Sequence, residues 1–188
     1  MKCLICGSGS DIARELGRRL IDDGWDVYAV PGRLMNVPSV KWDLIILAQG
    51  QLTPIGKFFD CSASEWVGGV MVNSIYPLAC LRAAWPNRNE GSTVVFMGGP
   101  NMVKLSPTYT AYRAGKAVLE AIAGTLEAAY PGHRFVVLHP GVVRTKNHAQ
   151  TVAAGARAAN YQRVVDIANG KEQTVSHDEV YQRLKGLM

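Results

Sequence analysis

Five short apolar runs, each typical of a buried β-strand, alternate along the chain with segments of helical spacing. The runs cover residues 2–6, 26–30, 42–48, 92–97 and 134–138. Helical spacing appears between them at residues 11–21, 62–84 and 112–130. Strands that alternate with helices form a parallel sheet whose two faces are both covered. The sequence therefore predicts an α/β fold with a doubly wound parallel sheet.

Length and composition favour one soluble domain spanning residues 1–188. No apolar run reaches 18 residues, so we expect no membrane span. The N-terminus has the pattern of a buried strand rather than a signal peptide, which predicts a cytoplasmic protein with reduced thiols. The net charge of +5 is spread along the chain. This distribution disfavours nucleic acid as a partner but is sufficient for an anionic cofactor.

Cys3 and Cys6 have the C-x-x-C spacing found in some redox and metal sites. Residues three apart in a strand face opposite sides of the sheet. We therefore favour two small buried hydrophobic side chains over a redox pair or a metal site.

A glycine turn follows the first strand and precedes the first helix. Its residues are Gly7, Ser8, Gly9 and Ser10, followed by Asp11 and Ile12. Glycine lets the backbone approach a pyrophosphate, and a helix N-terminus offers free N–H groups and positive potential. We interpret the turn as a phosphate-binding site, with Asp11 as a possible helix N-cap.

The connection from the second strand to the third run is unusually short. Residues 33–42 leave no room for a further strand and helix, whereas about 9 extended residues span roughly 30 Å, enough for a direct crossover. We therefore expect the third strand and its helix, which are usual in dinucleotide-binding folds, to be missing. At the tip of the second strand an arginine suits the 2′-phosphate of NADP, so Arg33 favours NADP over NAD. The alternative is an exposed loop arginine.

The helix over residues 62–84 begins with a capping box from Ser62 to Glu65. Asn73 lies inside it, four residues before Pro77. Proline has no N–H to bond the carbonyl of Asn73, which leaves that carbonyl available to a water or a ligand. The alternative is a solvated amide on a helix kinked for packing.

Tyr112 and Lys116 lie four residues apart and therefore share one helix face. A nearby cation lowers the pKa of a phenol, so Tyr112 becomes a candidate general acid or base. The alternative is a packed ring beside a solvated amine.

In the tail, 146–188, we expect a loose helix over 149–168, a break at Gly170 and a last helix capped by Ser176, with no final strand.

Together these features resemble the short-chain dehydrogenase/reductase family over about residues 2–145. The glycine turn is similar to the family's Thr-Gly-x-x-x-Gly-Ile-Gly, and Tyr112 and Lys116 match its Tyr-x-x-x-Lys. Asn73 matches the Asn of its mid-chain helix. The other matches are Leu47-Ala48-Gln49-Gly50 for Asn-Asn-Ala-Gly and Pro140-Gly141-Val142-Val143-Arg144-Thr145 for Pro-Gly-x-x-x-Thr.

The resemblance implies a shortened Rossmann-like fold and roles for the matching residues. Tyr112 would exchange a proton with the substrate oxygen, and Lys116 would lower its pKa and bond the nicotinamide ribose. Asn73 would hold a water. Val143 and Thr145 would fix the nicotinamide amide and the pyrophosphate. Family members usually pair through the helices that carry Asn73 and Tyr112, so a homodimer or homotetramer is expected.

One departure concerns the substrate. The family places a Ser at the position of Gly99, and Asn101 or Ser106 would have to supply the missing donor. Losing one such donor commonly costs about 10²–10³-fold in rate. We therefore weigh two hypotheses. The first is an NADP(H)-dependent oxidoreductase, with NAD possible, acting on a small-molecule carbonyl or alcohol. The alternative is a dinucleotide-binding or protein-interaction module without redox turnover.

Overall fold

The protein folds around one five-stranded parallel sheet with the strand order β2-β1-β3-β4-β5. The computed structural model describes residues 1–32, 37–99 and 106–188. All four neighbouring pairs of strands are parallel. The strands are β1 (Lys2–Cys6), β2 (Asp26–Val30), β3 (Trp42–Leu47), β4 (Arg88–Met97) and β5 (Arg134–Leu138). Four lie close to their predicted bounds, and β4 begins four residues earlier than residue 92.

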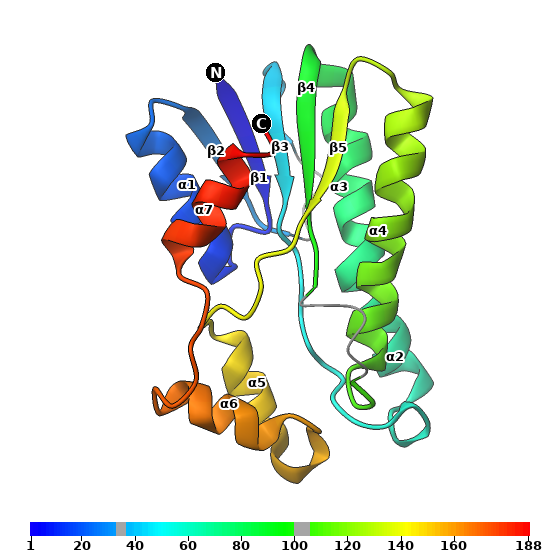
Figure 1. Ribbon diagram of the computed structural model, residues 1–188. Helices are drawn as coiled ribbons and strands as arrows, with labels where there is room; N and C mark the ends of the chain where they lie inside the picture. Colours follow the sequence, from blue (N-terminus) through cyan, green and yellow to red (C-terminus); the bar gives the residue numbers. More distant parts are fainter. Residues whose placement is uncertain (33–36, 100–105) are drawn as a thin grey trace.

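Helices cover both faces of the sheet, which confirms the predicted fold class (Figure 1). One face carries α1 (Asp11–Asp22) and α7 (His177–Lys185). The other carries α2 (Ala63–Val70), a π-helical turn (Met71–Ile75), α3 (Tyr76–Ala84) and α4 (Thr110–Ala129). Cys3 packs in the core of the first face and Cys6 in the core of the second, so the C-x-x-C residues do face opposite sides.

The shortened framework is as predicted. Within the described residues, no helix or strand lies between β2 and β3, and β5 forms the far edge of the sheet. Strand β2 forms the opposite edge. The sheet therefore lacks both the usual third strand and the usual final strand.

The tail differs from the single helix predicted over residues 149–168. It forms α5 (Asn147–Ala154) and α6 (Tyr161–Ala168), which lie beyond the carboxyl edge of the sheet (Figure 1). Gly155 has a φ of 56°, a left-handed conformation that ends α5 and that glycine adopts without steric cost. The prediction was wrong here because it ignored this glycine as a helix stop.

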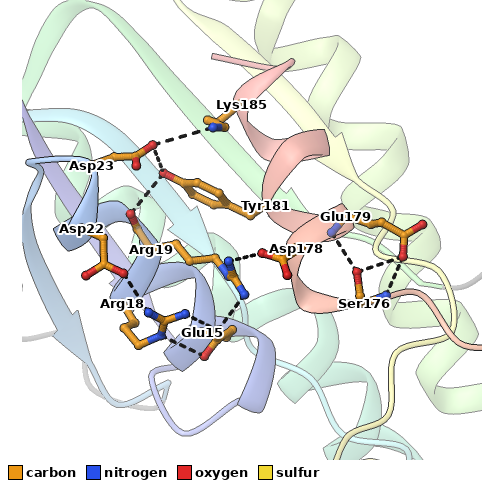
Figure 2. Close-up of polar contacts among 10 residues, drawn as sticks. All are labelled: Glu15, Arg18, Arg19, Asp22, Asp23, Ser176, Asp178, Glu179, Tyr181 and Lys185. Atoms are coloured by element: carbon orange, nitrogen blue, oxygen red, sulfur yellow. Dashed lines mark hydrogen bonds and ion pairs between the residues drawn. The ribbon is translucent and has the colours of Figure 1, made fainter.

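Polar side chains attach α7 to α1 (Figure 2). Arg19 of α1 pairs with Glu15 at 3.0 Å and with Asp178 at the start of α7. The hydroxyl of Tyr181 donates to Asp23 at 2.8 Å. The predicted Ser176 capping box is present at the N-terminus of α7. Together with Val180 and Leu184, which are buried in the core of this face, these contacts hold α7 on the sheet.

The continuous helical stretch from Ala63 to Asn87 is long and apolar enough, by length and composition, to cross a membrane. The core helix of a soluble protein passes the same test. Here the stretch packs on α4 and β3, and it buries Asn73 and Ser74. This packing buries 39% of the apolar stretch.

Helix α4 approaches the π-helical turn so closely that only glycine fits at one position. A Cβ on Gly115 would lie 2.5 Å from the Cβ of Asn73 and 3.2 Å from the carbonyl oxygen of Val70. Glycine at this position therefore sets the distance between the helix that carries Tyr112 and the segment that carries Asn73.

We predict that Gly115→Ala lowers the free energy of unfolding by about 1–3 kcal/mol, because the added methyl group forces the two helices apart. Urea denaturation measures the change. Gly124→Ala is the matched control on the same helix, since a Cβ there meets nothing within 4 Å. That variant should gain about 0.5–1 kcal/mol from helix propensity. Equal effects of the two substitutions would contradict the close approach.

Candidate active site

A cavity of about 470 Å³ lies at the carboxyl edge of the sheet. Its walls come from the turn after β1, the segments after β3 and β4, the N-terminal half of α4, the loop after β5, and helices α5 and α6. The cavity is continuous from Gly7 to Tyr112 and Lys116. Ligands of open α/β sheets bind at this edge.

Most of the predicted site residues line this cavity: Gly7, Gly9, Ser10, Asp11, Ile12, Ala48, Gln49, Gly50, Tyr112, Lys116, Pro140, Gly141, Val143 and Thr145. Ser8 and Asn73 are not among the lining residues. Arg33 and Asn101 lie outside the residues that the structure describes.

The glycine turn packs directly on the end of β3. Gly7 has a φ of 93°, and a Cβ there would lie 2.7 Å from the backbone nitrogen of Gln49. The N-cap of α1 is Ser10, whose hydroxyl accepts from the Ala13 N–H at 3.4 Å. The suggestion that Asp11 caps the helix was therefore wrong. Asp11 is instead the first residue inside the helix, and its carboxylate is free for other contacts.

The carboxylate of Asp11 binds the loop after β5. Its Oδ2 accepts from the backbone N–H of Lys146 at 2.6 Å, and its Oδ1 accepts from Arg14 at 2.5 Å. The ammonium of Lys146 in turn donates to the carbonyl of Gly9. Partial burial opposes ionisation of Asp11, but the Lys146 N–H and the Arg14 guanidinium outweigh it and lower the pKa of this carboxyl. Sequence reasoning missed Lys146, because it follows the recognised motif by one residue.

The ammonium of Lys116 is buried beneath the cavity floor, with 2% of the residue exposed. It donates to the backbone carbonyls of Gln49 at 2.9 Å and Met97 at 2.8 Å. Burial lowers the pKa of Lys116 from 10.5 to about 7. A Cβ on Gly50 would lie 3.4 Å from this nitrogen, so the segment after β3 packs closely on the amine.

Asn73 is fully buried, so the alternative of a solvated amide is wrong. Its side-chain nitrogen donates to the carbonyls of Gln51 at 2.9 Å and Gly69 at 2.8 Å, and its oxygen accepts from the Gln51 N–H at 3.1 Å. The amide thus fixes the segment after β3 against the helix. The kink expected from Pro77 takes the form of the π-helical turn just before it.

The Tyr112 ring and the Lys116 ammonium lie on the same side of α4, with 5.9 Å between the nitrogen and the ring centroid. The pKa of Tyr112, however, is raised rather than lowered. Burial is the larger cause, and the charge of Glu120 is the second. The expected lowering by Lys116 is absent because the ammonium is directed at two carbonyls and itself loses its proton near neutral pH.

The opposite wall is fixed by a residue that sequence reasoning did not select. The Tyr109 hydroxyl contacts Thr151 of α5 at 3.0 Å and donates to Asn160 at the start of α6. Ser106, three residues earlier, lines the cavity. The carbonyl oxygen of Gly99 lies in a hydrogen bond with Nδ1 of His139, at 3.0 Å. Ser106 therefore lines the same cavity as Tyr112, and its role as a replacement for the family's Ser stays a prediction.

One polar atom in the cavity wall is left without a partner. The side-chain nitrogen of Gln49 reaches the carbonyl of Gly32 at 3.4 Å and the sulfur of Cys80 at 3.2 Å, while its Oε1 is buried and unpaired. Among the described residues, no group of three or more His, Cys, Asp or Glu side chains is placed to hold a metal ion.

We predict that Lys116 makes the stability of the protein rise with pH above neutrality. Its pKa is about 7 in the folded chain and 10.5 when unperturbed. Between these values the unfolded chain binds more protons, so the free energy of unfolding increases, by up to about 1.4 kcal/mol per pH unit. Relative to Lys116→Met, the wild type should gain stability from pH 7 to 10 in urea titrations. Lys171→Met, at an exposed position, should keep that rise, and parallel curves for wild type and Lys116→Met would contradict the assignment.

Comparison with known proteins identifies the family. The model of a family described as enoyl-(acyl carrier protein) reductase matches residues 39–179, more than half of the chain. An uncharacterized oxidoreductase of Schizosaccharomyces pombe is 28% identical over 128 residues, which cover 64% of this chain and 52% of the relative. The chain thus spans about half the length of that curated relative.

Solved structures share the fold at low sequence identity. A small-chain dehydrogenase in complex with NADPH has a TM-score of 0.82 at 14% identity, over 99% of this chain and 90% of the other. The aldohexose dehydrogenase of Thermoplasma acidophilum has a TM-score of 0.80 at 15% identity, over 99% of this chain and 86% of the other. With the matched family model, the Rossmann-like sheet and the motif order, these likenesses lead to one conclusion: the chain belongs to the short-chain dehydrogenase/reductase family.

Proposed function

We propose that the protein is an NADP(H)-dependent oxidoreductase that moves a hydride between the nicotinamide and the carbonyl or alcohol carbon of a small molecule. The observation that carries this proposal is the single cavity that joins the glycine turn at Gly7 to Tyr112 and Lys116. A dinucleotide needs both ends of such a cavity: a turn for its diphosphate, and a proton donor beside its nicotinamide.

The residues of the cavity suit a dinucleotide. Gly7 lets the turn pack on the backbone of Gln49, where a Cβ would clash, and the unpaired Oε1 of Gln49 is a buried acceptor in the cavity wall. In our proposal the turn 7–12 holds the diphosphate and Lys116 bonds the nicotinamide ribose. Val143 and Thr145 hold the nicotinamide amide. When bound, the nicotinamide supplies or accepts the hydride, and the protein orients it.

Tyr112 would supply the proton. Because burial raises its pKa, the phenol carries its proton at neutral pH. It can therefore donate this proton to a carbonyl oxygen as the carbon is reduced. The fully buried Asn73 supports this geometry by holding the segment after β3 in place.

The choice of cofactor rests on Arg33, whose charge suits a 2′-phosphate. The NADPH complex of a structural neighbour is in keeping with NADP. We propose that NAD binds more weakly. A cytoplasmic location is in keeping with the reduced cysteines.

We also propose a homodimer or homotetramer formed through α2, the π-helical turn and α4. Val67, Ile75 and Val118 on these elements are 51%, 48% and 40% exposed. Apolar side chains of this size are typically buried when helices pair.

The decisive test of catalysis is Tyr112→Phe. We expect loss of at least about 10²-fold in kcat/KM for cofactor oxidation across a panel of carbonyl compounds, because the proton donor is removed. The panel is run with NADPH and with NADH. Tyr130→Phe, at an exposed ring beyond the end of α4, is the matched control and should retain activity. Equal rates for wild type and Tyr112→Phe would reject the proposed chemistry.

The alternative, a module that binds without turnover, is favoured by the absence of a hydroxyl at Gly99. If Ser106 supplies the substrate contact instead, Ser106→Ala should lower kcat by about 10-fold or more while cofactor binding is unchanged. Thr125→Ala, on the exposed face of α4, is the control. Unchanged kinetics in Ser106→Ala would remove Ser106 from the site. A chain that binds cofactor but turns over no carbonyl would support the module.

A further inference from the structure

The turn after β1 and the loop after β5 are tied together across the cavity, although two strands, β3 and β4, lie between β1 and β5 in the sheet. Asp11 accepts from the Lys146 N–H at 2.6 Å, and the Lys146 ammonium donates to the carbonyl of Gly9. Both residues line the cavity. Two hydrogen bonds from one residue therefore connect the two sides of the proposed diphosphate site.

The carboxylate of Asp11 lies where an anion would bind. It belongs to the first turn of α1, where the helix N-terminus favours negative charge. The contacts with Lys146 and Arg14 keep it ionised, as its lowered pKa indicates. A diphosphate that approached the same helix end would meet a like charge at short range. Short-range repulsion of this kind persists unless the charges are screened by salt.

Lys146 is the cation best placed to offset that repulsion. Its ammonium already donates to a carbonyl of the glycine turn, so a diphosphate bound to the turn would lie within its reach. Arg14 is less suitable, because its side chain is 68% exposed and pairs with Asp11 on the outer side of the helix.

We propose that Asp11 and Lys146 form an electrostatic latch that sets the affinity for the diphosphate of a dinucleotide. Lys146 moves its hydrogen bond from Gly9 to the diphosphate. Asp11, whose carboxylate is held by the Lys146 backbone N–H, lowers the affinity by placing a negative charge at the same helix end. Lys146 is thus a binding residue, and Asp11 is a residue that weakens binding. The inference rests on the dinucleotide binding proposed above and not on the redox chemistry.

Binding of ADP-ribose, which carries the diphosphate but no nicotinamide, tests the latch without any turnover. Isothermal titration calorimetry should show affinity about tenfold weaker for Lys146→Met, because a charged hydrogen bond is lost. Affinity should be several-fold tighter for Asp11→Asn, because the repulsion is removed. The gain in Asp11→Asn should shrink as ionic strength rises from about 0.02 to about 0.5 M, since salt screens the repulsion. The matched controls, Lys171→Met and Asp22→Asn, lie at exposed ion pairs outside the cavity and should bind as the wild type does.

Each outcome of the ADP-ribose titrations either supports or overturns the latch. Binding by Asp11→Asn where the wild type binds weakly or not at all supports the latch. Wild-type affinity in Lys146→Met, with only a lowered melting temperature, overturns it, because the contact would then be structural. Weaker binding by Asp11→Asn, or no binding by any variant, also overturns it. The redox proposal can fail while the latch holds. In that case Tyr112→Phe would leave turnover unchanged, and ADP-ribose binding would still depend on Lys146.

Discussion

The buried ammonium of Lys116 is the contact on which the arrangement of the site depends. It joins α4 to the carboxyl ends of two neighbouring strands, through the carbonyls of Gln49 after β3 and Met97 in β4. Burying an amine is costly unless it is hydrogen-bonded, and the lowered pKa of Lys116 records that cost. The same contacts direct the amine to the base of the cavity, where the cofactor is proposed to lie.

Close helix packing positions the other groups around this contact. Gly115 allows α4 to touch Asn73, and Asn73 in turn holds the backbone of Gln51. Tyr112 is therefore placed by a chain of contacts that runs through two helices and one loop. A rigid surround of this kind is what orientation of a substrate requires. It also explains why the phenol is buried enough to have a raised pKa.

The shortened framework is compensated by polar contacts rather than by added strands. Helix α7 is held on α1 through Arg19 and Tyr181 (Figure 2), and it buries Val180 and Leu184 in the core. On the other side of the cavity, Tyr109 holds α5 and α6 through Thr151 and Asn160. These side-chain hydrogen bonds add to the apolar packing of α6 and α7, which bury Val164 and Ile167, and Val180 and Leu184, respectively.

The sequence alone determined the order of the strands, the missing third and final strands, and the motifs whose residues mostly line the cavity, because periodicity, glycine turns and motif spacing are local signals. Only the tertiary structure decided the contacts between distant segments. It paired Lys146 with Asp11 across 135 residues of chain and showed Asn73 buried rather than solvated. It also reversed the expected shift in the pKa of Tyr112. Burial and long-range hydrogen bonds depend on which surfaces meet, and spacing along a helix cannot report that.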